Sequence, residues 1–114
     1  MTVERLDYGS VTVLRLEGDI DGNGVDALRA ILYECLSDAR VRLVMNLSGV
    51  GYISYMALGV IVERLRKMRQ QKGDIKLVGL NMQAKQLIRM SGVNGLFEQN
   101  DAEPQALAVY QEAA

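Results

Sequence analysis

The stretch Val41–Met68, VRLVMNLSGVGYISYMALGVIVERLRKM, decides the fold of this chain. Its first part places apolar side chains at alternate positions up to Leu47, which predicts a half-buried strand. From Leu58 onward apolar residues recur at helical spacing, which predicts an amphipathic helix. The turn Ser54–Leu58 joins the two. Because such a turn exposes free N–H groups and the positive end of the helix dipole, it is suited to a phosphate or a partner's carboxylate.

The same two patterns continue on both sides of this stretch. Upstream, Gly9-Ser10 between two apolar-rich segments predicts a hairpin, and Asn23 or Asp21 is expected to cap the helix that follows it. Downstream, Gly73 is expected to end the second helix in a left-handed conformation. Asn81 is expected to cap the third helix. The predicted strands are residues 3–8, 11–17, 41–47 and 75–80, and the predicted helices cover 25–36, 55–70, 82–90 and 103–110.

The order of these elements is β-β-α-β-α-β-α-α. Strands that alternate with helices require crossover connections, so the strands after the hairpin should pair in parallel and their connections should be right-handed. A chain of 114 residues suits one domain. The sequence therefore predicts a single α/β domain over residues 1–114, with a mixed sheet of about four strands and helices mainly on one face.

Composition excludes several classes of function. The net charge of −1 offers no basic excess for neutralising nucleic-acid phosphates. With no histidine there is no Ser-His or Cys-His pair, and no GK[ST] loop is present. Cys35 is the only cysteine and falls on an apolar helical stripe, which indicates core packing. No signal peptide and no stretch of membrane-spanning length is seen, so a cytoplasmic protein with no direct membrane insertion is expected.

The loop before the first helix matches two ligand motifs in part. Residues 22–27 fit G-x-G-x-x-A, but the preceding strand belongs to a hairpin and the chain is too short for a dinucleotide-binding fold. Asp19, Asp21, Asn23 and Gly24 fit the start of a calcium loop, whose twelfth position needs a glutamate and holds Ala30. The simpler interpretation is a polar turn, and no catalytic residue, cofactor or metal ligand is predicted.

Three blocks of the chain resemble one known family. Gly18-Asp19-Ile20-Asp21 is similar to the G-x-[IL]-D turn of STAS domains, the anti-sigma factor antagonist family. MNLSGVGYISYMALG resembles that family's signature D-L-S-x-V-x-x-[IM]-D-S-S-G-L-G, and KLVGLNMQAKQLIRMSGVNGLF resembles its closing strand, helix and "TGL…LF" end. The resemblance implies a non-enzymatic switch that docks on a kinase-like anti-sigma factor and is released when one serine is phosphorylated.

The departures from the signature fall at its acidic and phosphorylated positions. The signature aspartate falls on Ser54, the next serine on Tyr55 and the phosphorylated serine on Met56, while the strand-end aspartate is Asn46. Met56 cannot be phosphorylated. It is a flexible apolar side chain suited to packing against a partner. Ser54 is a candidate substitute phosphoacceptor, although a serine at a helix start is more often the N-cap.

The sequence thus predicts an interaction module that is not switched by serine phosphorylation. Its expected partner is an anti-sigma factor or serine-kinase-like protein. The alternatives are a structural subunit of a larger assembly, such as a lipid-transport ABC complex with its ATPase, and a small-molecule sensor. The predicted partner-binding residues are Asp19, Asp21, Gly22, Asn23, Gly24, Ser54, Tyr55, Met56, Ala57 and Leu58.

Overall fold

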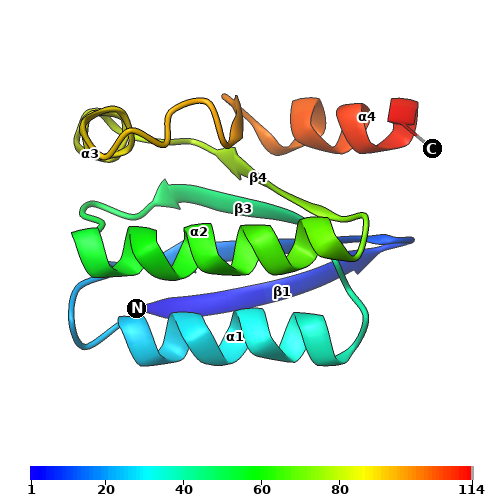
Figure 1. Cartoon of the computed structure of the whole chain (residues 1–114), viewed down its shortest axis with the longest axis horizontal. Coiled ribbons are helices and arrows are strands. Elements are labelled where there is room, and N and C mark those ends of the chain that lie inside the picture. The colour runs from blue at the N-terminus through cyan, green and yellow to red at the C-terminus, as the bar shows by residue number, and fades with distance from the viewer. Residues whose placement is uncertain (114) are drawn as a thin grey trace.

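The polypeptide forms a five-stranded mixed sheet with helices on both faces (Figure 1). The computed structural model describes the backbone of residues 1–113 and the side chains of residues 1–111. The strands are β1 (Thr2–Tyr8), β2 (Val11–Glu17), β3 (Arg42–Gly49), β4 (Asp74–Val78) and β5 (Glu98–Asn100). The helices are α1 (Val25–Ser37), α2 (Tyr55–Gln70), α3 (Met82–Met90) and α4 (Glu103–Ala113).

The strands lie in the order β1-β2-β3-β4-β5, with β1 antiparallel to β2 and all other neighbours parallel. The predicted α/β class, the hairpin and the parallel crossovers are confirmed. The sequence missed β5, whose three polar residues Glu-Gln-Asn have no alternating pattern to detect. A single domain over residues 1–114 stays a prediction, and residue 114 lies outside the described part.

Alternate residues of the central strands divide the core into two layers. Leu43, Met45 and Leu47 of β3 face the main core, which α1, α2 and α3 cover. Val44 faces the opposite side, in a smaller cluster with Ala106 and Tyr110 of α4. The prediction of a half-buried β3 is therefore wrong, because α4 covers the face that sequence alternation assigned to solvent.

Two predicted helix ends differ in their details. Gly24 is the N-cap of α1 without a side-chain hydrogen bond, and the carboxylate of Asp21 instead accepts the Asn23 N–H at 3.0 Å. After α2 the left-handed residue is Lys72, with φ of 65°. Gly73 serves another purpose, since a Cβ there would lie 1.9 Å from the Val41 carbonyl oxygen. The glycine permits a close approach of two backbones rather than a left-handed turn.

Parallel strands bring the loops that follow them to one edge. The carboxyl ends of β3 and β4 and the beginnings of α1 and α2 all lie at the left of Figure 1. In open parallel sheets this edge is the usual position of a binding site, because the crossover loops converge there. Within the described residues, no helix is both long enough and apolar enough to span a membrane.

Candidate functional site

Three loops form one continuous surface at the carboxyl edge of the sheet. The loop after β2 pairs with the loop after β3 through an isolated bridge between Ile20 and Ile53. Its hydrogen bonds run from Ile20 N–H to the Tyr52 oxygen (2.8 Å) and from Ser54 N–H to the Ile20 oxygen (2.9 Å). Both segments of the predicted partner-binding set are therefore held side by side by main-chain contacts.

Side chains at the start of α3 tie the third loop, which follows β4, to the other two loops. The amide of Gln83 both donates to and accepts from the main chain of Ile53, each at 2.9 Å. Asn81 caps α3 through the Ala84 N–H and donates to the Gly51 oxygen, at 2.9 Å in each case. The predicted cap is confirmed, and these amides fix the three loops relative to one another. Sequence reasoning assigned no such bridging role to Gln83, since its partner is 30 positions away.

Ser54 caps α2, as the sequence favoured. Its side chain accepts the Ala57 N–H at 3.1 Å, and its backbone is extended, as an N-cap requires. This contact satisfies one of the free N–H groups at the helix start, so the turn is less of an open anion site than its position suggested. The role of Ser54 as a substitute phosphoacceptor stays a prediction.

The structure divides the predicted partner-binding residues into two groups. Asp19, Asp21, Gly22, Asn23, Tyr55 and Met56 are exposed, with Tyr55 at 74% and Met56 at 60%. Gly24, Ala57 and Leu58 are buried, and Ser54 is partly buried. Ala57 and Leu58 belong to the main core and support the turn from inside, and Leu58 also lines a shallow groove beside α2.

Two further exposed apolar side chains lie at the same edge and were missed in the sequence. Tyr52 is 45% exposed and Met82, the first residue of α3, is 68% exposed. A signal existed, because each falls in a loop or first turn after a strand, where no core face is expected. We call the following set the edge surface: Asp19, Asp21, Asn23, Tyr52, Tyr55, Met56 and Met82.

The acidic residues of the edge surface are available for contacts. No cation among the described side chains forms an ion pair with Asp19 or Asp21. Gly51 lies against Asp19, since a Cβ at position 51 would be 3.1 Å from its Oδ1. No group of three or more His, Cys, Asp or Glu side chains within the described residues converges as a metal site. The loop of residues 19–24 therefore presents negative charge, and its carboxylates do not converge as a set of metal ligands.

Asn46, which stands where the family signature has an aspartate, is bound to α4. Its Nδ2 donates to Glu103 Oε2 at 2.5 Å, and its Oδ1 accepts the Ser48 N–H at 3.0 Å. Arg15 forms two hydrogen bonds to the same carboxylate, at 2.8 and 2.9 Å. These bonds, led by Arg15, lower the pKa of Glu103 below its usual value. An amide suits this position because it donates to the Glu103 carboxylate, which an aspartate at position 46 would repel.

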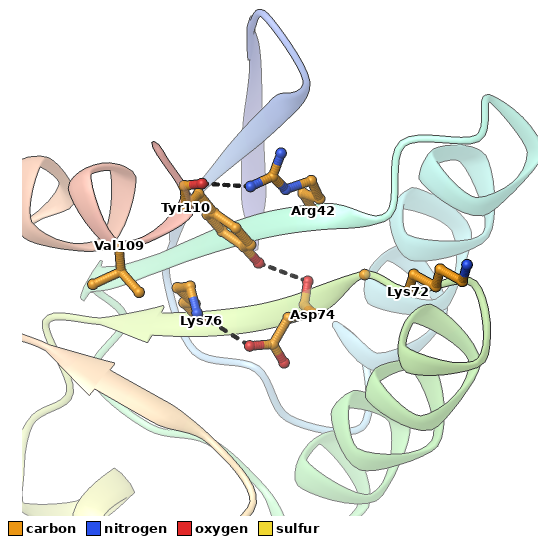
Figure 2. A pocket seen from close by; sticks show the side chains of 7 residues that line it. Arg42, Lys72, Asp74, Lys76, Val109 and Tyr110 are labelled. Atoms are coloured by element: carbon orange, nitrogen blue, oxygen red, sulfur yellow. Dashed lines mark hydrogen bonds and ion pairs between the residues drawn. The ribbon is translucent and has the colours of Figure 1, made fainter. Parts of the chain in front are cut away.

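A second region rich in charge lies beneath α4, where β3 and β4 begin (Figure 2). The Tyr110 hydroxyl donates to the carbonyl oxygens of Leu43 (2.7 Å) and Asp74 (2.8 Å). The Arg42 guanidinium lies 5.0 Å and the Lys76 ammonium 4.5 Å from the ring centroid. Burial raises the pKa of the Tyr110 hydroxyl far above its usual value, so it stays protonated as a donor.

The cations of this second region are engaged in holding the fold together. Lys76 pairs with Asp74 at 3.2 Å and with Glu98, and Arg42 donates to the Tyr110 carbonyl oxygen at 2.5 Å. The adjoining cavity has a volume of about 410 Å³, and the Lys72 side chain extends away from the ring (Figure 2). We call Arg42, Asp74, Lys76, Glu98 and Tyr110 the Tyr110 cluster. The contacts of Tyr110 in this cluster hold α4 against β3 and β4, and the ion pairs of Lys76 lie within the sheet.

Cys35 is fully buried in the main core, as predicted. Burial raises the pKa of its thiol to about 11, which keeps the thiolate form scarce at neutral pH. The side chain therefore acts as a core residue and not as a nucleophile.

The fold and the edge surface define a small α/β module whose carboxyl-edge loops form one presented surface. The family model described as STAS domain matches residues 3–106, so the chain belongs to the STAS family. The resemblance found in the sequence is thereby confirmed.

The chain is similar to proteins of two kinds, anti-sigma factor antagonists and a putative transporter. An anti-sigma F factor antagonist of Paenibacillus polymyxa is 25% identical over 108 residues, covering 94% of this chain and 92% of that protein. A putative sulfate transporter of Bacillus subtilis, YvdB, is 25% identical over 84 residues, which are 74% of this chain and 16% of that protein. The solved structure of the anti-sigma factor antagonist SpoIIAA in its unphosphorylated form superimposes with a TM-score of 0.85. It has 17% identity and covers 97% of each chain. The chain is thus an anti-sigma factor antagonist-like STAS domain.

Proposed function

We propose that this STAS domain is an interaction module that docks on an anti-sigma factor or a related kinase-like regulator through its edge surface. The observation that carries the proposal is the exposure of Tyr52, Tyr55, Met56 and Met82 together on rigidly joined loops. Large exposed apolar groups gathered on one surface mark interaction sites, and tyrosine and methionine are favoured in them. Catalysis has no part in this proposal.

The proposed docking is not switched by serine phosphorylation. Met56 occupies the position of the family phosphoserine and has no hydroxyl group, and Ser54 uses its oxygen to cap α2. A phosphate at the start of α2 would add a charge of about −1.5 to −2 next to Asp19 and Asp21. Without it, the surface keeps one charge state and control falls to the partner.

The experiment is to purify the anti-sigma factors encoded in the source genome, measure the binding of each, and incubate the binder with this protein and ATP. We expect one of them to bind and the intact mass of this protein to stay unchanged. The Met56→Ser variant is the matched control, expected to gain one phosphate if the binder is a kinase. Stoichiometric phosphate on the wild-type Ser54–Leu58 turn would overturn the unswitched mechanism, and failure of every anti-sigma factor to bind would overturn the partner assignment.

A second candidate is a structural subunit of a larger transport assembly. It is favoured by the match between this chain and a segment of a transporter. In that role the same edge surface would contact an assembly component, such as an ABC ATPase, instead of a signalling protein. Affinity purification from native extract separates the two candidates, because an anti-sigma factor is expected to be retained in one case and an ATPase in the other.

A further inference from the structure

A shallow apolar groove continues the edge surface along α2. It is lined by one stripe of that helix and by the segment after α3: Tyr55, Leu58, Gly59, Val62, Ser91 and Val93. We call this the α2–α3 groove. Tyr55 belongs to both the groove and the edge surface, so the groove begins at the turn where α2 starts. Gly59, in the middle of the stripe, leaves the groove open because it has no side chain.

The size of the groove indicates what fills it. Its volume is about 170 Å³. Pockets for free small molecules are usually larger, about 300–1,000 Å³, and bury most of the ligand. An open groove of this size instead suits one apolar side chain that a partner protein presents. An aliphatic or aromatic anchor in a pocket is the common centre of a protein interface.

Charged residues at the two ends of the α2–α3 groove indicate which charges the partner segment carries on either side of its apolar side chain. Asp19 and Asp21 lie beside the turn at one end, through the pairing of Ile20 with Ile53. Arg66 follows Val62 by four residues, so it continues the same helical stripe at the other end. None of the side chains described in the structure forms an ion pair with these three groups. Charge complementarity then requires opposite signs on the partner.

Building on the proposed docking function, we propose that the α2–α3 groove receives a single apolar side chain of the anti-sigma factor. The segment that carries it is basic where it meets Asp19 and Asp21 and acidic where it meets Arg66. This assigns a direction to the partner segment, since reversing it would place like charges together at both ends. The groove thus acts as an anchor site, whereas the edge surface supplies the surrounding contacts.

The sharpest test fills the groove without harming the fold. A Cβ at position 59 meets nothing within 4 Å and the position is exposed, so we expect Gly59→Leu to fold. Leucine is also a better helix former than glycine, so the thermal midpoint should stay the same or rise by a few degrees. The matched control is Lys67→Leu, which adds the same side chain to an exposed position of α2 away from the groove.

Affinity for the anti-sigma factor that binds the wild type is then measured for both variants. We expect Gly59→Leu to weaken binding by about tenfold or more and Lys67→Leu to change it by less than about threefold. Equal binding of wild type and Gly59→Leu would overturn the groove assignment and leave the proposed function standing. If no anti-sigma factor binds the wild type, the proposed function fails and the groove assignment fails with it.

Charge reversal provides the second measurement, for the direction of the partner segment. Arg66→Glu should weaken binding, and the loss should shrink at high salt because exposed charges are screened. Asp21→Lys should behave in the same way. Unchanged affinity in both variants would overturn the proposed direction while leaving the Gly59→Leu result to decide the anchor.

Discussion

The edge surface and the Tyr110 cluster both combine aromatic and charged side chains. They differ in how many of these side chains have hydrogen-bond or ion-pair partners within the protein. In the Tyr110 cluster the hydroxyl group has two acceptors and both cations have partners. On the edge surface Tyr55 and Met56 are mostly exposed, and Asp19 forms no ion pair with any of the described side chains. Composition alone does not separate the two regions. What separates them is whether the fold itself completes their contacts.

This difference has a physical basis. A buried polar group that lacks a partner destabilises the folded protein by about 1–3 kcal/mol. Pairing of the polar groups beneath α4 is therefore needed for stability. An exposed aromatic or methionine side chain carries little such penalty, and its contact area stays available until a partner arrives. Substitution in the Tyr110 cluster should therefore affect stability, whereas substitution on the edge surface should affect binding.

Replacing the tyrosines of the two regions gives the largest expected effect. Tyr110→Ala removes a buried ring and the donor to two carbonyl oxygens, so it should destabilise the protein by about 3–5 kcal/mol. Tyr55→Ala, at a 74% exposed position, should change stability by no more than about 0.5 kcal/mol. Urea unfolding of the two variants measures this contrast. Similar losses in both would contradict the division between a structural and a presented region.

Restoring the family aspartate should give the next largest effect. Asn46→Asp removes the donor to Glu103 and places two carboxylates within hydrogen-bond distance, which should cost about 1–3 kcal/mol at neutral pH. Adding Glu103→Gln is the control, because the new amide donates to the aspartate and should recover part of the loss. A single variant as stable as the wild type would show that Asn46 does not fasten α4.

The pH dependence of Asn46→Asp follows from the carboxylate pair. Repulsion raises the folded pKa of one carboxyl group above its unfolded value, so the penalty is complete above the folded pKa and disappears below the unfolded one. In the wild type the folded pKa of Glu103 is lowered, so its contribution is lost as the pH falls through that value. Both effects should make the difference in unfolding free energy between wild type and Asn46→Asp smaller at about pH 3.5 than at pH 7. Urea unfolding at the two pH values measures this difference.

Removing the α2 cap should give the smallest of these effects. Ser54→Ala leaves the Ala57 N–H without its acceptor, which should destabilise the protein by about 1 kcal/mol. Thermal unfolding measures it, with Ser37→Ala at the exposed end of α1 as the control, since that serine caps no helix start. A change as small as that of the control would mean that water replaces the Ser54 oxygen at the helix start.

Local patterns were sufficient to predict most of the fold. Alternating and helical spacing located α1, α2, α3, α4 and four of the five strands, and the family signature located the turn before α2. Local reasoning failed where a distant segment supplies the cause. Gly73 is glycine because the Val41 backbone passes within van der Waals distance, and Val44 is buried because Ala106 and Tyr110 of the distant helix α4 cover it.

The sequence predicted which two loops lie together at the candidate site, but not which of the nearby side chains are exposed there. The loop 19–24 and the turn 54–58 lie together, as expected for the carboxyl ends of parallel strands. Ala57 and Leu58 are buried in the main core, because residues at the start of a helix divide between core and solvent according to the rotation of the helix against the sheet. Leu58 still lines the α2–α3 groove, and the partner-binding role of both residues stays a prediction. Tyr52 and Met82 reach the same edge only through the tertiary arrangement of the loops.

The sequence by itself determined the α/β class, the order of the elements, the family and the absence of a phosphorylatable side chain at Met56. These depend on spacing and on residue identity, which are local properties. The tertiary structure alone decided which side chains are exposed together, which charges already have partners, and that a groove beside Gly59 continues the edge surface. Such properties depend on contacts between residues far apart in the chain, and no local pattern encodes them.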